Sequence, residues 1–263
     1  MIKVSTILDT ITEYTEVRVK EAKKVRSTED IERDAHSMER GQFEFEHALS
    51  KEGLSFILEC KKASPSKGII AEDYPFLDIA RKYEEAGADA ISVLTEPEWF
   101  LGSNDHLKEI AETVNIPVLR KDFTVDEYMI YEAKLLGASA VLLIVSILSE
   151  YDLKKYMSIC DDLGMSALVE THDENEIITA IAAGARIIGV NNRNLKDFTV
   201  NTDLSGHLRS LIPENILFVS ESGVSSAEDV NRIKAFGADA VLVGETMMRS
   251  DDKKSRLKEL RGF

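Results

Sequence analysis

The chain has 263 residues, of which 44% are hydrophobic and 30% are charged, and its formal net charge is −15. This acidic balance argues against nucleic acid as a partner, because nucleic-acid binding requires a concentrated basic face. The length fits either two average domains or one α/β barrel of about 250 residues, so the pattern along the chain has to decide between them.

The sequence gives no indication of a membrane or secreted protein. The longest apolar stretch, residues 140–148, is too short to cross a bilayer, and the first residues lack a basic segment followed by an apolar core. The two cysteines, Cys60 and Cys160, have no metal-ligand spacing and fit a reducing compartment. We therefore expect a cytoplasmic protein that does not bind a membrane.

The first 50 residues carry helical apolar spacing and lie outside the repeats found further along the chain. They predict two helices, over residues 5–26 and roughly 28–49. We interpret them as an extension that covers the rim of the following domain, in preference to a separate partner-binding unit.

From residue 83 onward, four segments share one pattern: the end of a helix, a glycine, a small residue and then an apolar strand. The glycine can adopt the left-handed conformation that ends a helix, and the small residue lets the chain turn tightly into the strand. The segments cover residues 83–96, 134–145, 180–193 and 234–246, with their glycines at Gly87, Gly137, Gly184 and Gly237.

Four further apolar runs, at residues 56–61, 117–121, 165–170 and 217–221, precede or separate these segments. The two sets give eight strands that alternate with helical stretches, which is the pattern of an α/β protein with a (β/α)8, or TIM, barrel. No linker rich in Pro, Gly or Ser interrupts the array. The sequence thus predicts a single barrel domain over residues 1–263, with residues 1–50 as its N-terminal helical extension.

Ionisable or polar residues stand where these apolar runs end. Side chains alternate along a strand, so these residues continue the inward-facing rows, and in this fold the active site lies at the C-terminal strand ends. A charged group there has to face a polar cavity or carry a large desolvation cost. We expect one shared site, although an ion-pair cluster at the rim would give the same pattern. The residues are Glu59, Lys61, Lys121, Glu170, Asn191, Glu221, Gly244 and Glu245.

Lysines and glutamates around a dry pocket can perform acid–base chemistry, because their neighbours shift their pKa values toward neutrality. A lysine in such a pocket can also form a Schiff base. The residue pattern leaves these roles open.

Cys60 alternates with Glu59 and Lys61, so its side chain is expected to point outward, into the helix layer.

The loops after the first, seventh and eighth predicted strands indicate a phosphate site. Ser222 and Gly223 follow strand seven, and Gly244 and Glu245 follow strand eight, where this fold commonly presents a short helix to phosphate. Residues 64–68, after strand one, offer hydroxyl groups and a glycine hinge. The side chain of Glu245 would repel an anion, so only its backbone N–H is expected to contribute.

Aromatic side chains near the predicted barrel mouth can line a pocket for a ring. Phe100 follows Trp99 in the loop after strand two, and Phe123 lies just beyond strand three. Packing of Trp99 against the N-terminal helices is an equally good interpretation.

His172 lies close to Glu170 but receives no role, because a lone loop histidine is more often solvated than catalytic. Motifs for nicotinamide, nucleoside triphosphate or zinc are missing.

With these residues laid out, the chain resembles the indole-3-glycerol phosphate synthase family of tryptophan biosynthesis. The matching segments run in order from strand one to strand eight. A different phosphate-binding barrel would share the glycines, but not residues 121–123 together with residues 191–195. The segments are ECKKASPSKG (59–68), LTEPEWFLGS (94–103), LRKDF (119–123), IYEA (130–133), LVE (168–170), GVNNRNL (189–195), SESGV (220–224) and GETMM (244–248).

The resemblance implies an enzyme, a carboxy-lyase, that converts 1-(2-carboxyphenylamino)-1-deoxyribulose 5-phosphate into indole-3-glycerol phosphate with loss of CO2 and water. It implies that Lys121 protonates the substrate carbonyl during ring closure. Lys61 would bind the carboxylate that leaves as CO2, with Arg193 nearby as a weaker candidate. Glu59 and Glu170 would divide the acid and base tasks of dehydration, and which of them is the acid stays open.

The other site residues implied by the resemblance fall into three groups. Sugar hydroxyls and the lysine ammonium groups would be held by Asn191, Glu221 and Ser222. Phosphate would be bound by Ser64, Gly223, Gly244 and the Glu245 backbone. The anthranilate ring would be enclosed by Pro65, Phe100, Phe123 and Leu142. No metal or organic cofactor is implied, the partner is a small phosphorylated substrate, and we expect a monomer, with the oligomeric state left open.

Two other functions fit part of the pattern. A sister phosphosugar barrel, such as phosphoribosylanthranilate isomerase, needs one acid–base pair and would leave Lys61 and a third carboxylate unexplained. A non-catalytic barrel that only binds a phosphorylated metabolite needs no matched acid–base pair, and replacing Lys121 would then change affinity alone.

Overall fold

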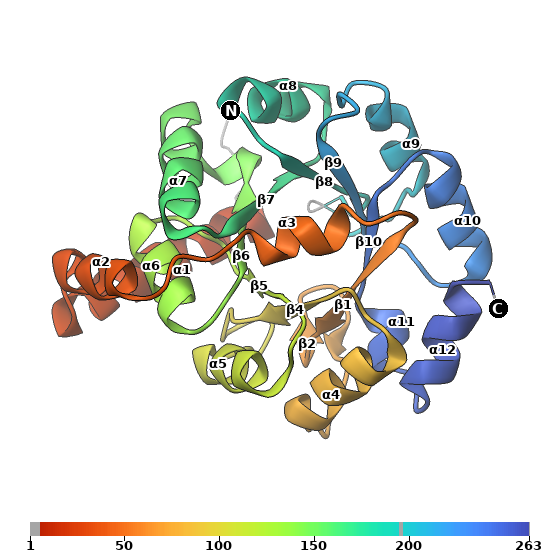
Figure 1. The fold of residues 1–263 in the computed structure, drawn as a ribbon, viewed down its shortest axis with the longest axis horizontal. Coiled ribbons are helices and arrows are strands. Elements are labelled where there is room, and N and C mark those ends of the chain that lie inside the picture. Colours follow the sequence, from red (N-terminus) through yellow and green to blue (C-terminus); the bar gives the residue numbers. More distant parts are fainter. Residues whose placement is uncertain (1–5, 195–196, 263) are drawn as a thin grey trace.

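The computed structural model describes residues 6–194 and 197–262. Ser5, where the first helix is expected to begin, and Leu195 of the GVNNRNL segment lie outside the described residues. Eight parallel strands close into a barrel in the order β1-β10-β9-β8-β7-β6-β5-β4 (Figure 1), which confirms the predicted (β/α)8 architecture. The strands are β1 (Ser55–Cys60), β4 (Ala90–Leu94), β5 (Val118–Lys121), β6 (Ala140–Ile144), β7 (Ser166–Thr171), β8 (Ile187–Asn191), β9 (Leu217–Glu221) and β10 (Ala240–Val243).

The repeated glycines lie at the turns from helix to strand, as predicted. Gly87, with φ of 96°, ends α4 (Phe76–Ala86), and Gly184, with φ of 93°, ends α8 (Glu174–Ala183). Gly137 and Gly237 have φ values of 84° and 81° just beyond α6 (Glu127–Leu135) and α10 (Ala227–Ala235). Because residues with a Cβ rarely adopt this conformation, the glycine spacing located these junctions in the sequence.

Helices surround the barrel (Figure 1). Most begin after a Ser or Asp whose side chain accepts a hydrogen bond from the first turn, as Ser149 does from the Asp152 N–H. Besides α4 and α8 they are α5 (Asn104–Thr113), α6 (Glu127–Leu135), α7 (Glu150–Leu163), α9 (Asp203–Arg209), α10 (Ala227–Ala235), the short α11 (Glu245–Met248), α12 (Lys253–Leu260) and the 3-10 turn η1 (Val145–Ile147).

The strands separate two apolar layers. Inward-facing side chains such as Ile57, Leu119 and Leu168 fill the barrel, and outward-facing ones pack against the helices. Cys60 is fully buried in the outer layer, which confirms its predicted direction. Burial raises the pKa of its thiol, so that it behaves as a small apolar group.

The N-terminal extension contains three helices, α1 (Ile7–Val25), α2 (Thr28–Ser37) and α3 (Glu44–Leu49), so the single helix predicted over residues 28–49 is wrong. Between α2 and α3 the chain pairs with the end of α7: the N–H groups of Gly41 and Phe43 donate to the carbonyls of Leu163 and Gly164, at 3.0 and 3.1 Å. A Cβ on Gly41 would lie 2.4 Å from the Gly164 oxygen. The chain between the two helices thus makes a close backbone contact with the end of α7, and Phe43 adopts a left-handed conformation with φ of 57° just before α3.

Helices α1 and α3 lie at opposite ends of the barrel (Figure 1). The fully buried Phe45 and Leu49 of α3 pack against the inward layer, and the Glu46 N–H donates to Ser166 at the start of β7, at 3.2 Å. At the other end, residues of α1 reach the cavity described below. Helices of the first 50 residues thus contact the barrel at both of its ends.

The loop after β1 forms a small antiparallel hairpin of β2 (Ala63–Ser64) and β3 (Gly68–Ile69), which the sequence did not indicate. Its turn is closed by a hydrogen bond of 3.2 Å from the Lys67 N–H to the Ser64 carbonyl. Among the residues described, no helix has both the length and the apolar character needed to cross a membrane.

Candidate active site

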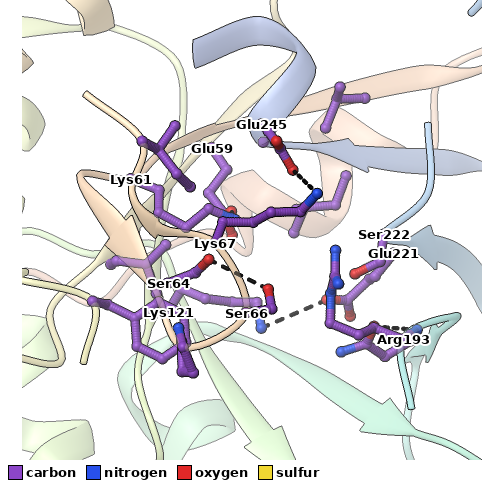
Figure 2. A pocket seen from close by; sticks show the side chains of 18 of the residues that line it. Glu59, Lys61, Ser64, Ser66, Lys67, Lys121, Arg193, Glu221, Ser222 and Glu245 are labelled. Carbon is purple, nitrogen blue, oxygen red and sulfur yellow. Dashed lines mark hydrogen bonds and ion pairs between the residues drawn. The ribbon is translucent and has the colours of Figure 1, made fainter. Parts of the chain in front are cut away.

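A cavity of about 1030 Å³ lies at the C-terminal ends of the strands (Figure 2). In the described part of the chain, no group of three or more His, Cys, Asp or Glu side chains is arranged to hold a metal ion. The cavity lining includes every residue that the sequence assigned to the site: Glu59, Lys61, Ser64, Pro65, Phe100, Lys121, Phe123, Leu142, Glu170, Asn191, Arg193, Glu221, Ser222, Gly223, Gly244 and Glu245.

Lys121, the last residue of β5, lies between two carboxyl groups. Its Nζ donates to Glu170 Oε2 on β7 at 3.0 Å and lies 3.6 Å from Glu221 Oε2 on β9. The side chain of Lys121 is 15% exposed, and those of both glutamates are 2% exposed. In Figure 2 the side chains of Lys121 and Glu221 approach each other across the cavity. Ionisable groups from three strands therefore meet at one point.

The pKa values of Lys121 and Glu170 move apart. Burial favours a neutral lysine, but the carboxylates of Glu170 and Glu221 outweigh it and raise the pKa of Lys121. Burial also opposes ionisation of Glu170, yet the nearby cations of Lys121 and His172 hold the pKa of this carboxyl well below its usual range. At neutral pH the two residues form an ammonium–carboxylate pair. Our expectation that such groups approach neutrality is wrong for this pair.

Glu221 does follow that expectation. Burial, together with the negative charges of Glu170 and Glu59, raises the pKa of Glu221 to about 8 against the opposing effect of Lys121. Its Oε1 is buried and has no hydrogen-bond partner among the described residues. A Cβ on Gly189 would lie 2.2 Å from this oxygen, so the glycine in β8 leaves the space that the carboxyl group occupies. The surroundings of Glu221 therefore favour its protonated form, in contrast to those of Glu170.

A second acid–base pair lies on the β1 side. Lys61 Nζ donates to Glu59 Oε1 at 2.5 Å, and their side chains are 17% and 5% exposed. Gly244 leaves the room for them, because a Cβ there would lie 2.5 Å from Glu59 Oε1 and 3.1 Å from Lys61 Nζ. The ammonium group of Lys61 thus faces the cavity, with a carboxylate that balances its charge.

Strand β9 ends in a tight left-handed turn. Ser222 has φ of 66° and Gly223 has φ of 92°. Such a conformation is rare for a residue with a side chain and occurs preferentially at functional sites. The turn is held by the buried side chain of Asn192, whose Nδ2 lies 3.0 Å from the Glu221 carbonyl oxygen and 3.2 Å from that of Ser222. This role of Asn192 was not evident from the sequence.

The rim next to this turn carries both signs of charge. The Glu245 carboxylate accepts a hydrogen bond from Arg249 Nε at 3.0 Å and lies 3.7 Å from Lys67 Nζ (Figure 2). These two cations compensate the negative charge that would repel an anion. On the β8 side, Arg193 Nη1 donates to the Phe198 carbonyl at 3.1 Å. The contribution of the Glu245 backbone to anion binding stays a prediction.

One wall of the cavity is apolar. Phe100 and Phe123 lie with their ring centroids 6.1 Å apart, and Leu142 and Pro65 belong to the same lining. Trp99 packs edge-on against Tyr14 of α1, at 5.3 Å between centroids. Of the two interpretations of Trp99, packing against the N-terminal helices is the one found.

His172, which received no role from the sequence, lies beside Glu170. Its Nε2 lies 3.3 Å from Glu170 Oε1, and its Nδ1 lies 3.1 Å from Glu176 Oε2 on α8. Burial lowers the pKa of the imidazole, but the two carboxylates outweigh burial and raise it to about 10. The signal was present, because a residue two positions after Glu170 lies on the same side of an extended chain.

Residues of the N-terminal extension also line the cavity. Ile7, Leu8 and Ile11 of α1 belong to its lining. Arg18 of the same helix forms an ion pair of 2.8 Å with Asp122, the residue that follows Lys121. The apolar face of this helix was visible in the sequence, but the side of the barrel that it covers was not.

A closed (β/α)8 barrel with a lysine held between carboxyl groups at its strand ends defines a barrel enzyme built for acid–base chemistry. The family model described as indole-3-glycerol phosphate synthase matches residues 8–260. The chain belongs to this family.

Two curated relatives carry the same family name. The protein from Ruminiclostridium cellulolyticum is 54% identical over 257 residues, which cover 97% of this chain and 99% of the relative. The protein from Lachnoclostridium phytofermentans is 48% identical over 269 residues, covering 98% of this chain and 99% of the relative.

Solved structures at low identity share the fold alone. Thiamine phosphate pyrophosphorylase from Pyrococcus furiosus has a TM-score of 0.61 at 15% identity, covering 83% of this chain and 96% of that one. A mandelate oxidase has a TM-score of 0.57 at 19% identity, covering 70% of this chain and 66% of that one.

Proposed function

We propose that this chain converts 1-(2-carboxyphenylamino)-1-deoxyribulose 5-phosphate into indole-3-glycerol phosphate, with loss of CO2 and water, as a step of tryptophan biosynthesis. The observation that carries the proposal is the position of Lys121, 3.0 Å from Glu170 and 3.6 Å from Glu221, in a cavity that has an apolar wall and a rim with Lys67 and Arg249 beside Glu245. Membership of the family and the names of the relatives support the same reaction.

Ring closure requires an acid for the substrate carbonyl oxygen as the aryl carbon attacks. Lys121 is the group suited to this task, because it is an ammonium ion at neutral pH and stands at the centre of the strand ends. The carbonyl oxygen becomes strongly basic as the new carbon–carbon bond forms, so proton transfer from the ammonium group becomes favourable in the transition state. Glu170 and Glu221 hold the ammonium group in place.

Decarboxylation requires that the leaving carboxylate be bound near the apolar wall. Lys61 supplies a cation on the β1 side of the cavity, and the side chains of Phe100, Phe123, Leu142 and Pro65 would enclose the ring. The electron pair of the broken carbon–carbon bond returns to the ring system, which regains its aromatic character, and CO2 leaves. Arg193 is the weaker candidate for the same carboxylate.

Dehydration requires an acid for the departing hydroxyl group and a base for the proton whose loss completes the indole. Glu170 is suited to be the base, because nearby cations keep it ionised. The acid then comes from the pair of Glu59 and Lys61, which share a hydrogen bond of 2.5 Å. Asn191, Glu221 and Ser222 would hold sugar hydroxyls and the Lys121 ammonium group.

The phosphate group would bind at the β1, β9 and β10 loops. Ser64, Gly223, Gly244 and the backbone of Glu245 line the cavity there. Lys67 lies at the same rim, so it adds a positive charge that the sequence analysis did not assign.

Replacing Lys121 by Ala is expected to abolish turnover without unfolding the protein, because the proposed proton donor of the first step is lost. The measurement is the growth of indoleglycerol phosphate fluorescence from purified substrate, without added metal, together with a thermal unfolding curve. A variant that kept the wild-type kcat would remove Lys121 from the mechanism. A change confined to substrate affinity would favour the non-catalytic binding barrel.

Replacing Glu170 by Gln is expected to lower kcat by ~10²–10⁴-fold, the usual range for a general acid or base. The amide keeps the shape and the hydrogen bond to Lys121 but cannot accept the proton. Steady-state kinetics at several substrate concentrations separate the two constants. An effect on KM alone would give Glu170 a binding role instead.

A further inference from the structure

We propose that His172 is a positioning residue for the proposed reaction, and that its protonated ring holds the second oxygen of the Glu170 carboxylate while Lys121 holds the first. The inference rests on the proposed function, because it concerns the group proposed there as the base. His172 itself does not have to touch the substrate.

The two oxygens of Glu170 face two different cations. Oε2 accepts a hydrogen bond from Lys121 Nζ at 3.0 Å. Oε1 lies 3.3 Å from His172 Nε2, an ion-pair distance at which this nitrogen makes no hydrogen bond within the described structure, so the contact acts through charge. The Glu170 side chain is 2% exposed, so water can do little to stabilise its charge. Glu221, which shares Lys121 with Glu170, is the other acidic group at this point, and its carboxyl group and that of Glu170 oppose each other's ionisation.

The ring of His172 is fixed from the outside of the barrel. Its backbone N–H donates to Glu176 Oε2 at 2.7 Å, and its Nδ1 lies 3.1 Å from the same oxygen. Glu176 is itself held in the first turn of α8, where its N–H donates to Asp173 at 2.9 Å. A ring with a carboxylate at each nitrogen is attractive at both only when both nitrogens carry a proton. The raised pKa of His172 agrees with this geometry.

The arrangement matters at one point of the reaction. Once Lys121 has given its proton to the substrate, it is neutral and no longer stabilises the Glu170 carboxylate. His172 then remains as the cation that keeps Glu170 ionised and oriented for proton removal. Without His172, Glu170 would bind a proton more readily in the buried pocket and lose its capacity as a base.

The test compares His172→Gln and His172→Ala with the unaltered enzyme in kcat/KM and kcat between pH 5 and 9. Gln keeps a donor near the Nε2 position but loses the charge. We expect the acid limb of kcat, which reports the substrate-loaded enzyme in which Lys121 gives up its proton, to move up by about one pH unit. At pH 7 kcat should fall about tenfold, with KM changed by less than about twofold. His207→Gln is the matched control, because His207 pairs with Glu174 at 3.0 Å on the exposed surface, and its profile should equal that of the wild type.

Two results would overturn the proposal. One is an unchanged acid limb in a folded His172→Gln variant whose only defect is a lower Tm, since that is the behaviour of a structural residue. The other comes from the unaltered protein: nitrogen-15 NMR, with the His172 signals assigned from the variant, should show both ring nitrogens protonated at pH 8, and a neutral ring there contradicts the proposal. Failure of the unaltered enzyme to turn over the substrate would instead contradict the proposed function.

Discussion

Glu170 and Glu221 stand at equivalent strand ends and contact the same lysine, yet their pKa values move in opposite directions. Glu170 lies 3.0 Å from Lys121 and 3.3 Å from His172. Glu221 lies 3.6 Å from Lys121 alone, and its Oε1 is buried with no hydrogen-bond partner in the described structure. A buried carboxyl group with a raised pKa lowers the free energy of unfolding at high pH, where it has to ionise away from water. Groups of this kind occur mainly at functional sites.

Replacing Glu221 by Gln is expected to stabilise the fold increasingly as the pH rises from 5 to 8, and to lower turnover. The folded-state pKa of about 8 lies above the ordinary value of 4.5. Stability from the protonated group is therefore complete below the ordinary value and is lost as the pH rises through about 8, whereas Gln has no such dependence.

Thermal unfolding across this pH range measures the effect of Glu221→Gln, with an expected gain in Tm on the order of a few degrees at pH 8. Glu52→Gln, at an exposed position, is the control and should leave the shape of the Tm curve unchanged. Parallel curves for the Glu221 variant and the wild type would show that Glu221 is ionised in the folded state at neutral pH.

At the scale of elements, helix α1 is connected to the centre of the site through Asp122. This buried carboxylate pairs with Arg18 at 2.8 Å and accepts hydrogen bonds from Thr95 Oγ1 at 2.6 Å and from the Phe123 N–H at 2.8 Å. Burial opposes its ionisation, but Arg18 and Arg120 outweigh burial and lower its pKa. The network joins α1 to the loops after β4 and β5, which carry part of the apolar wall.

Replacing Arg18 by Met is expected to lower the free energy of unfolding by about 1.5–3 kcal/mol, the range for hydrogen bonds to charged groups. KM should rise as well, because α1 contributes Ile7, Leu8 and Ile11 to the cavity. Urea unfolding and steady-state kinetics measure the two effects. The control is Arg33→Met, which removes an exposed pair with Asp30 and should cost much less than Arg18→Met, because solvent screens the pair. Equal results for both variants would mean that α1 is not held by Asp122.

The sequence predicted those helices and strands that are determined by residues within the element itself or at its ends. Buried parallel strands appear as apolar runs, and Gly87 or Gly184 marks a helix end by its own backbone conformation. The break between α2 and α3 was missed, and the backbone contact made there joins Gly41 to Gly164, which is far from it along the chain. The β2–β3 hairpin was missed because its strands are two residues long and carry no alternation.

At the scale of the whole molecule, closure of the barrel made the site predictable. Once eight strands are known to form a closed parallel barrel, the residues at their C-terminal ends have to meet, so Lys121 and Glu170 could be placed together although 49 positions separate them. Their ionisation could not be predicted in the same way. It depends on distances of a few ångströms to His172 and Glu221, which only the packed structure determines.

In this fold the N-terminal end of the barrel contributes mainly to stability, and the C-terminal end carries the chemistry. The variant Phe45→Ala tests whether this holds here. Phe45 of α3 is fully buried against the inward layer at the N-terminal end of the strands, away from Lys121 and Glu170. Its truncation should lower the free energy of unfolding by about 3–5 kcal/mol through lost burial and the cavity left behind. Turnover per folded molecule should stay unchanged, because this fold performs its chemistry at the other end.

Denaturant unfolding and kcat, both measured well below the Tm of the variant, decide the outcome for Phe45→Ala. Tyr151→Ala is the control at an exposed aromatic position and should change stability by no more than about 0.5 kcal/mol. A large fall in kcat for folded Phe45→Ala would show that packing at the bottom of the barrel is transmitted to the strand ends. The barrel interior would then act as a continuous support for the Lys121 site, and α3 would be part of the catalytic structure.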